Sequence, residues 1–416
     1  MTNPLDRRSF LAMLGAIPVA RLLAAEGDEQ SAVESLQSSK PSGPCGLAKA
    51  GDFLLEPGLA YLQTGSVGPS PRPVIDRTIA AWMELETNPV FHAYKHFRAE
   101  LEEVRNKAAA LLRCTHDEIV LTKSATDGMN AVATGLDLAP GDHVITTDQE
   151  HGGGRFCWEY LVHRRGIVLD EVAIPPGEKD PQAILDRFRK AVTPRTRVLS
   201  FSHVLYSTGL RMPVAELSAL ARAHGCLAIV DGAQTAGGID VDVSAMGCHV
   251  YVTTGHKWLL GPKGTGVQFL RADARERVRL IAEQENRNAQ SDSSGLLNIP
   301  GMLGLGAAID YVSALGMGKI ETHNLQLRNR LFEMLGEVPN VRVVSPPPGP
   351  LASPLVTVQT QEAINTAEIV QRMHEKHQVM LKGVARLPHG LRFSTHLFNS
   401  MEDVERAVAA LRAEFA

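Results

Sequence analysis

The sequence has few cysteines, and none of them form the closely spaced pairs typical of zinc ligands. The five cysteines among 416 residues stand singly, and their odd number does not suit a disulfide framework. We therefore expect no metal site and interpret each cysteine as a small buried apolar residue. They are Cys45, Cys114, Cys157, Cys226 and Cys248.

An excess of basic residues is also absent. The chain has 42 Lys and Arg against 46 Asp and Glu, a net charge of -4, whereas general binders of nucleic acid or of anionic membranes are basic. Both kinds of partner are therefore disfavoured. Hydrophobic residues make up 44% of the chain, a globular balance, and the length supports two or three compact units.

Long hydrophobic runs are missing as well. The apolar run Phe10–Ala20 is about half the length of a membrane-spanning helix, and it follows the adjacent residues Arg7 and Arg8. Residues 1–26 resemble a twin-arginine (Tat) signal peptide. This predicts export to the periplasm by the twin-arginine translocase, without a membrane anchor. A cytoplasmic protein that begins with an amphipathic helix is the alternative.

Short apolar runs of strand length recur from residue 119 onward, and several are separated by helical patterns. This alternation predicts an α/β fold with a mostly parallel seven-stranded sheet and helices on both faces. The runs are Ile119–Leu121, Val144–Thr146, Val172–Ile174, Val198–Phe201, Leu227–Val230, Val250–Thr253 and Val267–Leu270.

Apolar residues at helical spacing predict several helices. Between them we predict an N-terminal arm over 27–57, a large domain over 58–300 and a small C-terminal α+β domain over 301–416. The helical segments include Val74–Trp82, Arg98–Leu112, Val214–His224, a long stretch from about Met302 to Met334, and Glu402–Phe415.

A lysine stands directly beyond one predicted strand. In TTGHKWLLGPKGTG the strand ends in a turn that carries Thr254, His256 and Lys257, and open α/β sheets bind ligands at the carboxyl ends of their strands. A desolvated lysine beside another basic group has a lowered pKa and can form a Schiff base. A solvated surface lysine is the ordinary alternative.

Two further strands bring polar residues to the same edge. LAIVDGAQTAGG places Asp231 at a strand end, with Gln234 after it. A carboxylate there can keep a pyridine nitrogen protonated, which makes the ring an electron sink; it can equally cap the following loop. LTKSATDGMN places Ser124, Ala125 and Thr126 at a helix start, which suits a phosphate or is an ordinary N-cap.

A histidine follows a fourth strand. In DQEHGGGRFCW, His151 stands where an imidazole can stack on a flat ring, and the three glycines after it allow a close approach of the backbone.

Together these segments resemble the class V aminotransferase family of pyridoxal-phosphate (PLP) enzymes, which have fold type I. The resemblance rests on GHK around Lys257, DGAQ around Asp231, SATDGMN, and the pair Glu150 and His151. YLQTGSVGPSPRPV, SHVLYSTGLRMPV and GHKWLLGPKGTG are most similar to the isopenicillin N epimerase branch. LRFSTHLFNSMEDVERAV is similar to the family's C-terminal domain.

The resemblance implies a role for each site residue. Lys257 would bind pyridoxal 5'-phosphate as a Schiff base and move the Cα proton, Asp231 would pair with the pyridinium, and His151 would stack on the ring. Arg392 would bind the substrate carboxylate, for which its planar fork is suited. The other residues expected to bind the cofactor are Gln234 at the ring hydroxyl, Ser124, Ala125, Thr126, Thr254 and His256 at the phosphate, His203, and Thr265 from the partner subunit of a homodimer.

The sequence departs from the family pattern at two places. Tyr206 stands where many relatives carry an asparagine near the cofactor. The segment Val379–Leu391 lacks the mobile cysteine that cysteine desulfurases need, so persulfide chemistry is disfavoured. We interpret Lys382 and His389 in this segment as surface residues.

The function that the resemblance implies is chemistry at the Cα of an amino acid or of an amino-acid-containing metabolite. Epimerisation, transamination and elimination, including C–S lyase chemistry, remain open. The leading alternative is similarity to an exported relative that modifies the glutamate side chain of the siderophore pyoverdine. A PLP-binding sensor without turnover is disfavoured because Lys257, Asp231 and Arg392 are present together.

Overall fold

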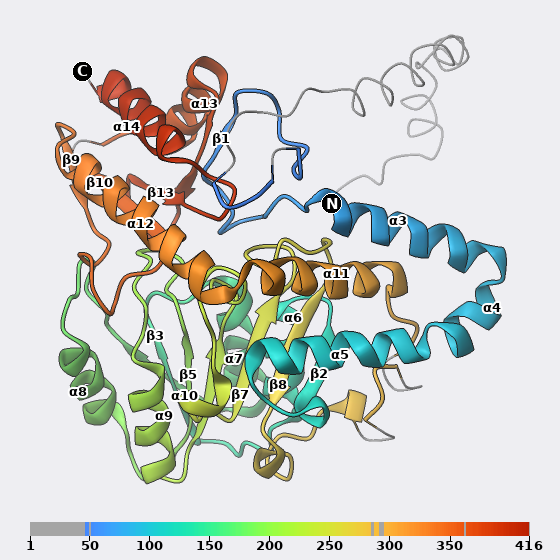
Figure 1. The fold of residues 1–416 in the computed structure, drawn as a ribbon. Helices are drawn as coiled ribbons and strands as arrows, with labels where there is room; N and C mark the ends of the chain where they lie inside the picture. The colour runs from blue at the N-terminus through green and yellow to red at the C-terminus, as the bar shows by residue number, and fades with distance from the viewer. Residues whose placement is uncertain (1–45, 50, 284–286, 291–294, 362, 416) are drawn as a thin grey trace, which may run out of the picture. The chain divides into compact units, whose positions relative to one another are not determined.

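The computed structural model describes residues 46–49, 51–283, 287–290, 295–361 and 363–415, and Gly43–Ala416 forms one compact unit (Figure 1). The predicted signal peptide at residues 1–26 and Cys45 lie outside the described residues. The structure does not test the boundaries of the predicted arm and of the two predicted domains.

A seven-stranded sheet forms the centre of this unit, in the order β2-β8-β7-β6-β5-β3-β4. Strands β3 to β7 pair in parallel, and β8 is antiparallel to both of its neighbours. The predicted mostly parallel sheet is therefore confirmed. The strands are β2 (Ile119–Thr122), β3 (His143–Thr147), β4 (Val168–Val172), β5 (Thr196–Ser202), β6 (Leu227–Asp231), β7 (Val250–Thr254) and β8 (Gly266–Leu270).

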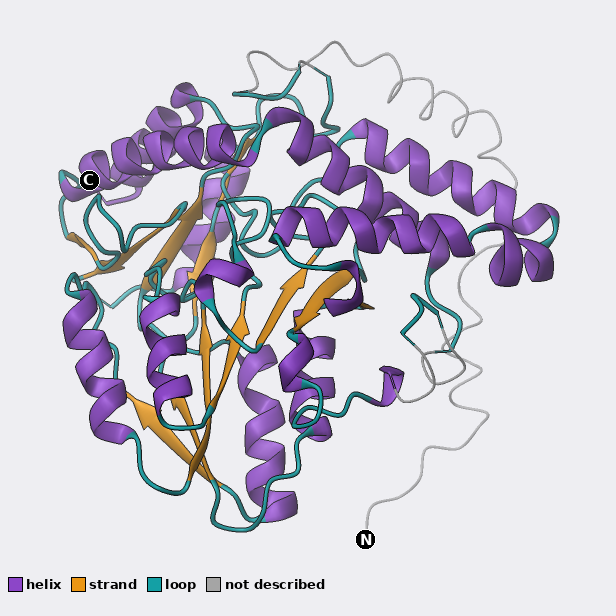
Figure 2. Cartoon of the chain, turned by 60° about the horizontal axis from the view of Figure 1, so that its bottom comes forward, coloured by secondary structure: helices purple, strands orange, loops and turns teal. Residues whose placement is uncertain are grey.

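Helices cover both faces of the sheet, as Figure 2 shows. Side chains alternate between the faces of a strand, so Ile229 of β6 joins the apolar core formed with α6 and α7, while Ala228 and Val230 join the core that includes α5, α8, α9 and α11. These helices are α5 (Arg98–Leu112), α6 (Ala125–Gly135), α7 (Gly152–Arg165), α8 (Pro181–Ala191), α9 (Val214–Ala223) and α11 (Ile299–Leu315).

One strand prediction was wrong in its position. The fourth strand runs over Val168–Val172 and not over Val172–Ile174. It lies at the edge of the sheet, and only its last residue is buried. An edge strand with a solvated face needs no apolar run, and of the run that we used to predict it only Val172 belongs to the strand, whereas Ile174 lies in the loop after it.

The C-terminal part of the chain builds a second, four-stranded sheet in the order β12-β13-β10-β9, whose pairs are all antiparallel. A short parallel pair joins β1, near the N-terminus, to β11, so residues 60–61 pack with the C-terminal elements. The elements are β1 (Ala60–Tyr61), β9 (Val341–Val343), β10 (Leu355–Thr360), β11 (Val379–Met380), β12 (Lys382–Val384), β13 (Gly390–Ser394), α13 (Thr366–His377) and α14 (Met401–Phe415).

The long helix predicted from about Met302 to Met334 is in fact two helices. α11 ends at Leu315 and α12 (Met317–Gly336) begins after Gly316, whose φ of 88° lies outside the helical region. Within the described residues no single helix is long and apolar enough to span a membrane; α11 and α12 meet that test only together, and they are bent by 77°.

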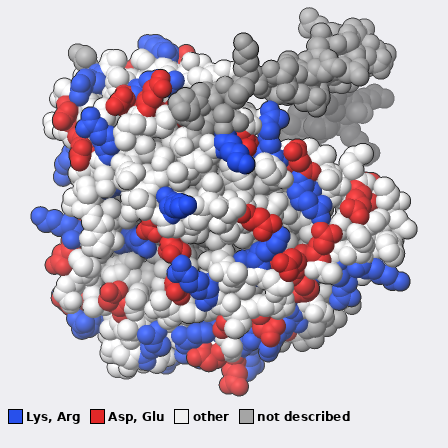
Figure 3. Space-filling view, in the orientation of Figure 1, with Lys and Arg blue, Asp and Glu red and all other residues white. Residues whose placement is uncertain are grey.

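The remaining helical elements are short, apart from α3. They are α3 (Arg72–Thr87), α4 (Pro89–Phe91), α10 (Val243–Met246), the π-helix η2 (His92–His96) and the 3-10 helices η3 (His116–Glu118), η4 (Ala272–Ala274) and η5 (Ile281–Glu283). Acidic and basic side chains are interspersed on the face drawn in Figure 3.

Candidate active site

A cavity of about 370 Å³ opens at the carboxyl ends of β5, β6 and β7. It lies where open α/β sheets bind ligands, and it brings together most of the residues predicted to form the site. Those that line it are Ser124, Ala125, Thr126, His151, Asp231, Gln234, Thr254, His256, Lys257 and Arg392.

Lys257 follows β7, and Asp231 ends the adjacent strand β6. Burial lowers the pKa of the Lys257 amine to about 8, and the positive charges of Arg392 and Lys382 act in the same direction, against the attraction of Asp231. About a tenth of the amines are then unprotonated at pH 7. A lowered pKa of this kind is what the predicted role of Lys257 as a nucleophilic amine requires.

Asp231 presents a carboxylate to the cavity. Burial raises its pKa, while a hydrogen bond from the backbone of Ala233 and the charge of Lys257 lower it. The Ala233 N–H donates to Oδ1 at 2.9 Å. A methyl group at Gly154 would lie 2.6 Å from Oδ2, closer than nonbonded atoms approach. The predicted role of the glycines is therefore seen, because the start of α7 packs directly on this acid.

His151 caps α7. Its Nδ1 accepts the backbone N–H of Gly153 at 3.0 Å, which leaves Nε2 to carry the proton of the neutral ring. Burial and the charges of Lys257, Lys382 and Arg392 lower its pKa to about 4. The Tyr206 ring meets the imidazole edge to face at 5.0 Å. His151 is thus an oriented, neutral ring suited to stacking.

The N-terminus of α6 forms an anion seat. Ser124 Oγ accepts the N–H of Asp127 at 3.1 Å, so Ser124 is an N-cap, and the first-turn N–H groups of Ala125 and Thr126 have no partner within a helix that begins there. Thr254 Oγ1 lies 2.8 Å from His256 Nδ1 beside them. Helix N-terminal N–H groups together with a hydroxyl suit a phosphate.

Gln234 is held at both ends of its amide. Its Nε2 donates to the Gly65 carbonyl at 2.8 Å, and its Oε1 accepts from the indole N–H of Trp258 at 2.9 Å. A primary amide has two N–H groups and two lone pairs. One of each remains for a ligand in the cavity.

Two predicted residues do not line the cavity. His203 Nδ1 lies 2.9 Å from the Tyr251 hydroxyl, inside the core on the far side of the sheet, so its position does not support the predicted contact with the cofactor. Thr265 donates to the Pro262 carbonyl of its own chain at 2.6 Å. Its contribution to a partner subunit stays a prediction.

Arg392 is buried on β13 without a carboxylate partner. Nη1 donates to the Tyr206 carbonyl at 2.9 Å and Nη2 to Ser66 Oγ at 3.2 Å, and no ion pair among the described residues includes it. Burial lowers its pKa to about 10. A desolvated guanidinium bonded only to neutral oxygens is a strong site for a carboxylate.

Lys382 lines the same cavity, so our interpretation of it as a surface residue was wrong. It lies opposite Arg392 in the antiparallel pair of β12 and β13, and burial together with Arg392 lowers its pKa. Directly opposed residues point to one face. The position of Lys382 in the cavity follows from the pairing of β12 with β13. The sequence around Lys382 alone does not indicate it.

The sequence analysis also missed the segment Gly65–Val67, which lines the cavity after β1. Glu150 lies behind the cavity wall, where burial raises its pKa to about 7. Its carboxylate accepts the hydroxyls of Thr147 at 2.7 Å and Ser202 at 2.5 Å. Glu150 therefore fixes the β3 end that carries His151.

The residues fit the cofactor that the resemblance implies. The anion seat, the acid at Asp231, the flat His151 and the amine of Lys257 match, in one cavity, a phosphate, a ring nitrogen, a ring face and an aldehyde. PLP would supply the electron sink for chemistry at Cα, and these residues would hold it.

The chain is similar to known proteins along most of its length. The family model described as aminotransferase class-V matches residues 60–407. The chain is similar to isopenicillin N epimerase of Streptomyces clavuligerus, with 30% identity covering 87% of this chain and 96% of the relative. It is also 31% identical to a probable cysteine desulfurase of Pseudomonas putida, over 84% and 92% of the two chains.

Solved structures share the fold. The cystine C–S lyase C-DES, in complex with its reaction product cysteine persulfide, superposes with a TM-score of 0.77 at 24% identity, over 85% of this chain and 97% of that one. A variant of the same lyase, with glycine covalently linked to the PLP cofactor, gives a TM-score of 0.76 at 24% identity, over 85% and 96%. The chain therefore belongs to the aminotransferase class V family of PLP-dependent enzymes.

Proposed function

We propose that this PLP-dependent enzyme acts at the Cα of an amino acid or amino-acid-containing metabolite that carries a second carboxylate. The observation behind the proposal is the pair Arg392 and Lys382, a buried guanidinium and a half-buried amine that lie opposite each other in the cavity that holds Lys257. A single carboxylate of a substrate can pair with only one of these two cations. A substrate with two carboxylates neutralises both, whereas a substrate with one leaves a buried charge unpaired.

The residues of the chain divide the work at Cα. Asp231 would keep the cofactor ring nitrogen charged, His151 would hold the ring face, and the α6 N-terminus would hold the phosphate. Arg392 binds the α-carboxylate and Lys382 the distal one. The Nζ of Lys257, with its lowered pKa, takes the Cα proton and returns it.

Epimerase or aminotransferase chemistry fits this cavity better than persulfide chemistry. Two relatives are named isopenicillin N epimerase and others cysteine desulfurase, but no described cysteine lines the cavity. Burial raises the pKa of Cys157 and Cys248 to about 12, which leaves these thiols unreactive. A glutamate side chain in a siderophore such as pyoverdine meets the same demand for a second carboxylate and is the second candidate.

We expect the rate of cofactor uptake by the cofactor-free protein to rise with pH and to level off above about pH 8, because only the unprotonated Lys257 amine reacts. An ordinary lysine would keep gaining reactivity up to about pH 10. The measurement is the growth of the yellow absorbance after mixing with PLP.

Nα-acetyl-lysine, whose ε-amine is free, is measured under the same conditions and corrects for the titration of the cofactor itself. Lys257→Ala should leave no adduct that borohydride fixes. A rate that follows acetyl-lysine across the pH range, or an adduct on another lysine, would refute the assignment.

We expect Lys382→Gln to raise KM for substrates with two carboxylates about tenfold to a hundredfold, since a hydrogen bond to a charged group contributes about 1.5–3 kcal/mol. KM for substrates with one carboxylate should not rise. Steady-state kinetics on paired acidic and neutral amino acids measure both effects.

Lys319→Gln, which removes an exposed lysine from α12, is the matched control and should change neither KM. An equal loss for both substrate classes in Lys382→Gln would contradict the proposed second carboxylate. Full cofactor loading without turnover of any amine would favour the sensor hypothesis instead.

We further propose a homodimer, for which the exposed apolar side chains on α3, the α4–η2 segment and α7 are the support. Scattered exposed apolar residues are ordinary, but neighbouring ones mark interfaces, and Ile79, Trp82 and Met83 lie at helical spacing on one face of α3. The residues and their exposed fractions are Ile79 58%, Trp82 56%, Met83 68%, Val90 73%, Tyr94 55%, Phe156 66% and Tyr160 56%.

Trp82→Glu should then raise the dissociation constant of the dimer at least about tenfold, because central aromatic residues dominate interface energy. Sedimentation equilibrium measures this against the chain mass of 45.0 kDa. Met401→Glu, at a methionine that is 41% exposed on α14, serves as the control. A wild-type chain that stays monomeric at all concentrations would be the contrary result.

We propose that the chain is exported to the periplasm by the twin-arginine route. Replacing Arg7 and Arg8 with lysine in the full chain should keep the protein in the cytoplasm, as cell fractionation would show. Arg21→Lys, in the same segment but outside the pair, should be exported normally. Continued export of the double variant would favour the cytoplasmic alternative or another route.

A further inference from the structure

Three potential ligands meet where α3 is followed by α4 and the π-helix η2, at the outer end of α3 in Figure 1. Glu84 comes from α3, and His92 and His96 are the first and last residues of η2. One ligand atom from each lies within 4.8 Å of the other two. Two imidazoles and a carboxylate are a common donor set for Zn²⁺ and related divalent metals.

The hydrogen bonds of Thr87 settle which nitrogen of His92 carries its lone pair. The Thr87 hydroxyl donates its single proton to the Glu84 carbonyl at 2.8 Å. It must therefore accept from His92 Nε2, which lies 3.0 Å away. Nδ1 is then the acceptor nitrogen of a neutral ring. A fixed outer nitrogen is also how metal-binding histidines are oriented.

This Nδ1 is buried and has no hydrogen-bond partner among the described residues. It lies 3.9 Å from Glu84 Oε1, which in turn lies 2.9 Å from His96 Nε2. A lone pair and a carboxylate oxygen that lie this close repel each other unless a cation or a proton lies between them. Ligand atoms around a tetrahedral zinc are about 3.3 Å apart, within the range of the distances seen here.

Neighbouring rings hold the two histidines in place. The centroids of His92 and His96 are 5.1 Å apart, with the rings nearly perpendicular. Phe97, which is fully buried, packs against both, at 5.6 Å and 5.0 Å. The backbone N–H of Phe97 donates to the His92 carbonyl at 3.0 Å, five residues back. Such π-turns inside helices recur at functional sites.

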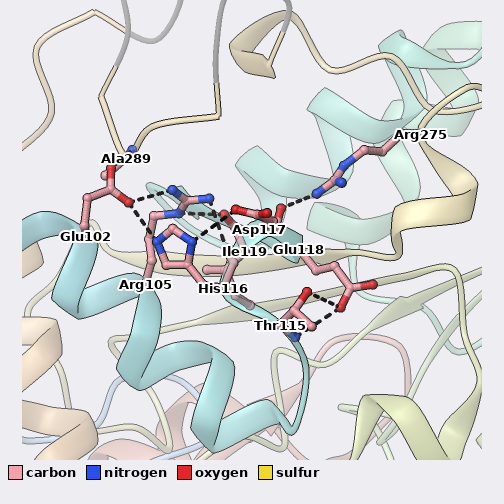
Figure 4. Close-up of polar contacts among 9 residues, drawn as sticks. All are labelled: Glu102, Arg105, Thr115, His116, Asp117, Glu118, Ile119, Arg275 and Ala289. Atoms are coloured by element: carbon pink, nitrogen blue, oxygen red, sulfur yellow. Dashed lines mark hydrogen bonds and ion pairs between the residues drawn. The ribbon is translucent and has the colours of Figure 1, made fainter.

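A second cluster of histidine and carboxylates in the same chain shows the contrast. Around His116, drawn in Figure 4, both ring nitrogens have partners: Nε2 lies 2.9 Å from Glu102 and Nδ1 lies 3.2 Å from Asp117. Arg105 also donates to Glu102 at 2.7 Å. Both ring nitrogens of His116 therefore have a partner without an ion. The cluster at Glu84 differs because one of its nitrogens has no partner among the residues described.

We propose that Glu84, His92 and His96 bind a divalent transition metal of the Zn²⁺ type, with water in the remaining position. We expected no metal site because the sequence has no closely spaced cysteines. These ligands come from two helices and lie on the surface, where Glu84 and His96 are 42% and 43% exposed and His92 is 13% exposed. In the single chain these side chains are partly open to solvent, and in the proposed homodimer they would border the interface.

Calorimetric titration of the chelator-treated holoenzyme with Zn²⁺ tests the proposal. We expect a single ion per chain, and at least about a tenfold loss of affinity in both Glu84→Gln and His92→Gln. His116→Gln is the matched control and should bind as the wild type does. Since Glu84 is exposed, Glu84→Gln should keep its fold, which circular dichroism and cofactor content check.

Titration with Co²⁺ gives an independent reading, because its visible spectrum reports tetrahedral coordination by nitrogen and oxygen. Loss of that spectrum in Glu84→Gln, with the PLP absorbance unchanged, would support the site. Absence of binding to the wild type, or an equal loss in His116→Gln, would overturn it. Neither result depends on the reaction that the enzyme catalyses.

Discussion

The electrostatic balance at the Lys257 amine is the constraint on which the site depends. Burial and the two cations Arg392 and Lys382 lower its pKa, while Asp231 opposes them. The same carboxylate is buried deeply enough for its own pKa to rise. The two groups act on each other: the charge of Asp231 raises the pKa of the Lys257 amine, and the charge of Lys257 lowers the pKa of the Asp231 carboxyl, which would pair with the ring nitrogen of the cofactor.

The parallel sheet makes this balance possible. β6 and β7 are neighbours that run in the same direction, so Asp231 and Lys257 leave the sheet at one edge although 26 positions separate them. At glycines around the cavity, the backbone lies close to the side chains of the site. A methyl group at Gly153 would lie 2.3 Å from Thr126 Oγ1, and one at Gly65 would lie 3.0 Å from an Arg392 nitrogen. The walls of the cavity are therefore partly backbone, which cannot be repacked as side chains can.

The sequence was sufficient to predict residues whose place follows from a strand end. Asp231 ends the buried strand β6 and Lys257 lies in the turn after the buried strand β7, and both line the cavity. His203 was misjudged because side chains alternate: Ser202 faces the cavity, so its successor must face the opposite side. Lys382 was missed because its position depends on the pairing of β12 with β13, a contact between segments that no local pattern encodes. The position of β4 was also missed, because this strand lies at the edge of the sheet and only its last residue is buried, so its sequence carries no apolar run.

The two cations also bear on which bond at Cα is broken. PLP would supply the electron sink for the bond that is broken, so the choice of bond would depend on how the residues of the chain orient the substrate. One carboxylate contact leaves the rotation of the substrate partly free, whereas a second contact on the same face of one small sheet restricts it. Because Lys382 and Arg392 are fixed opposite each other by the β12–β13 ladder, the sheet itself would set the rotation.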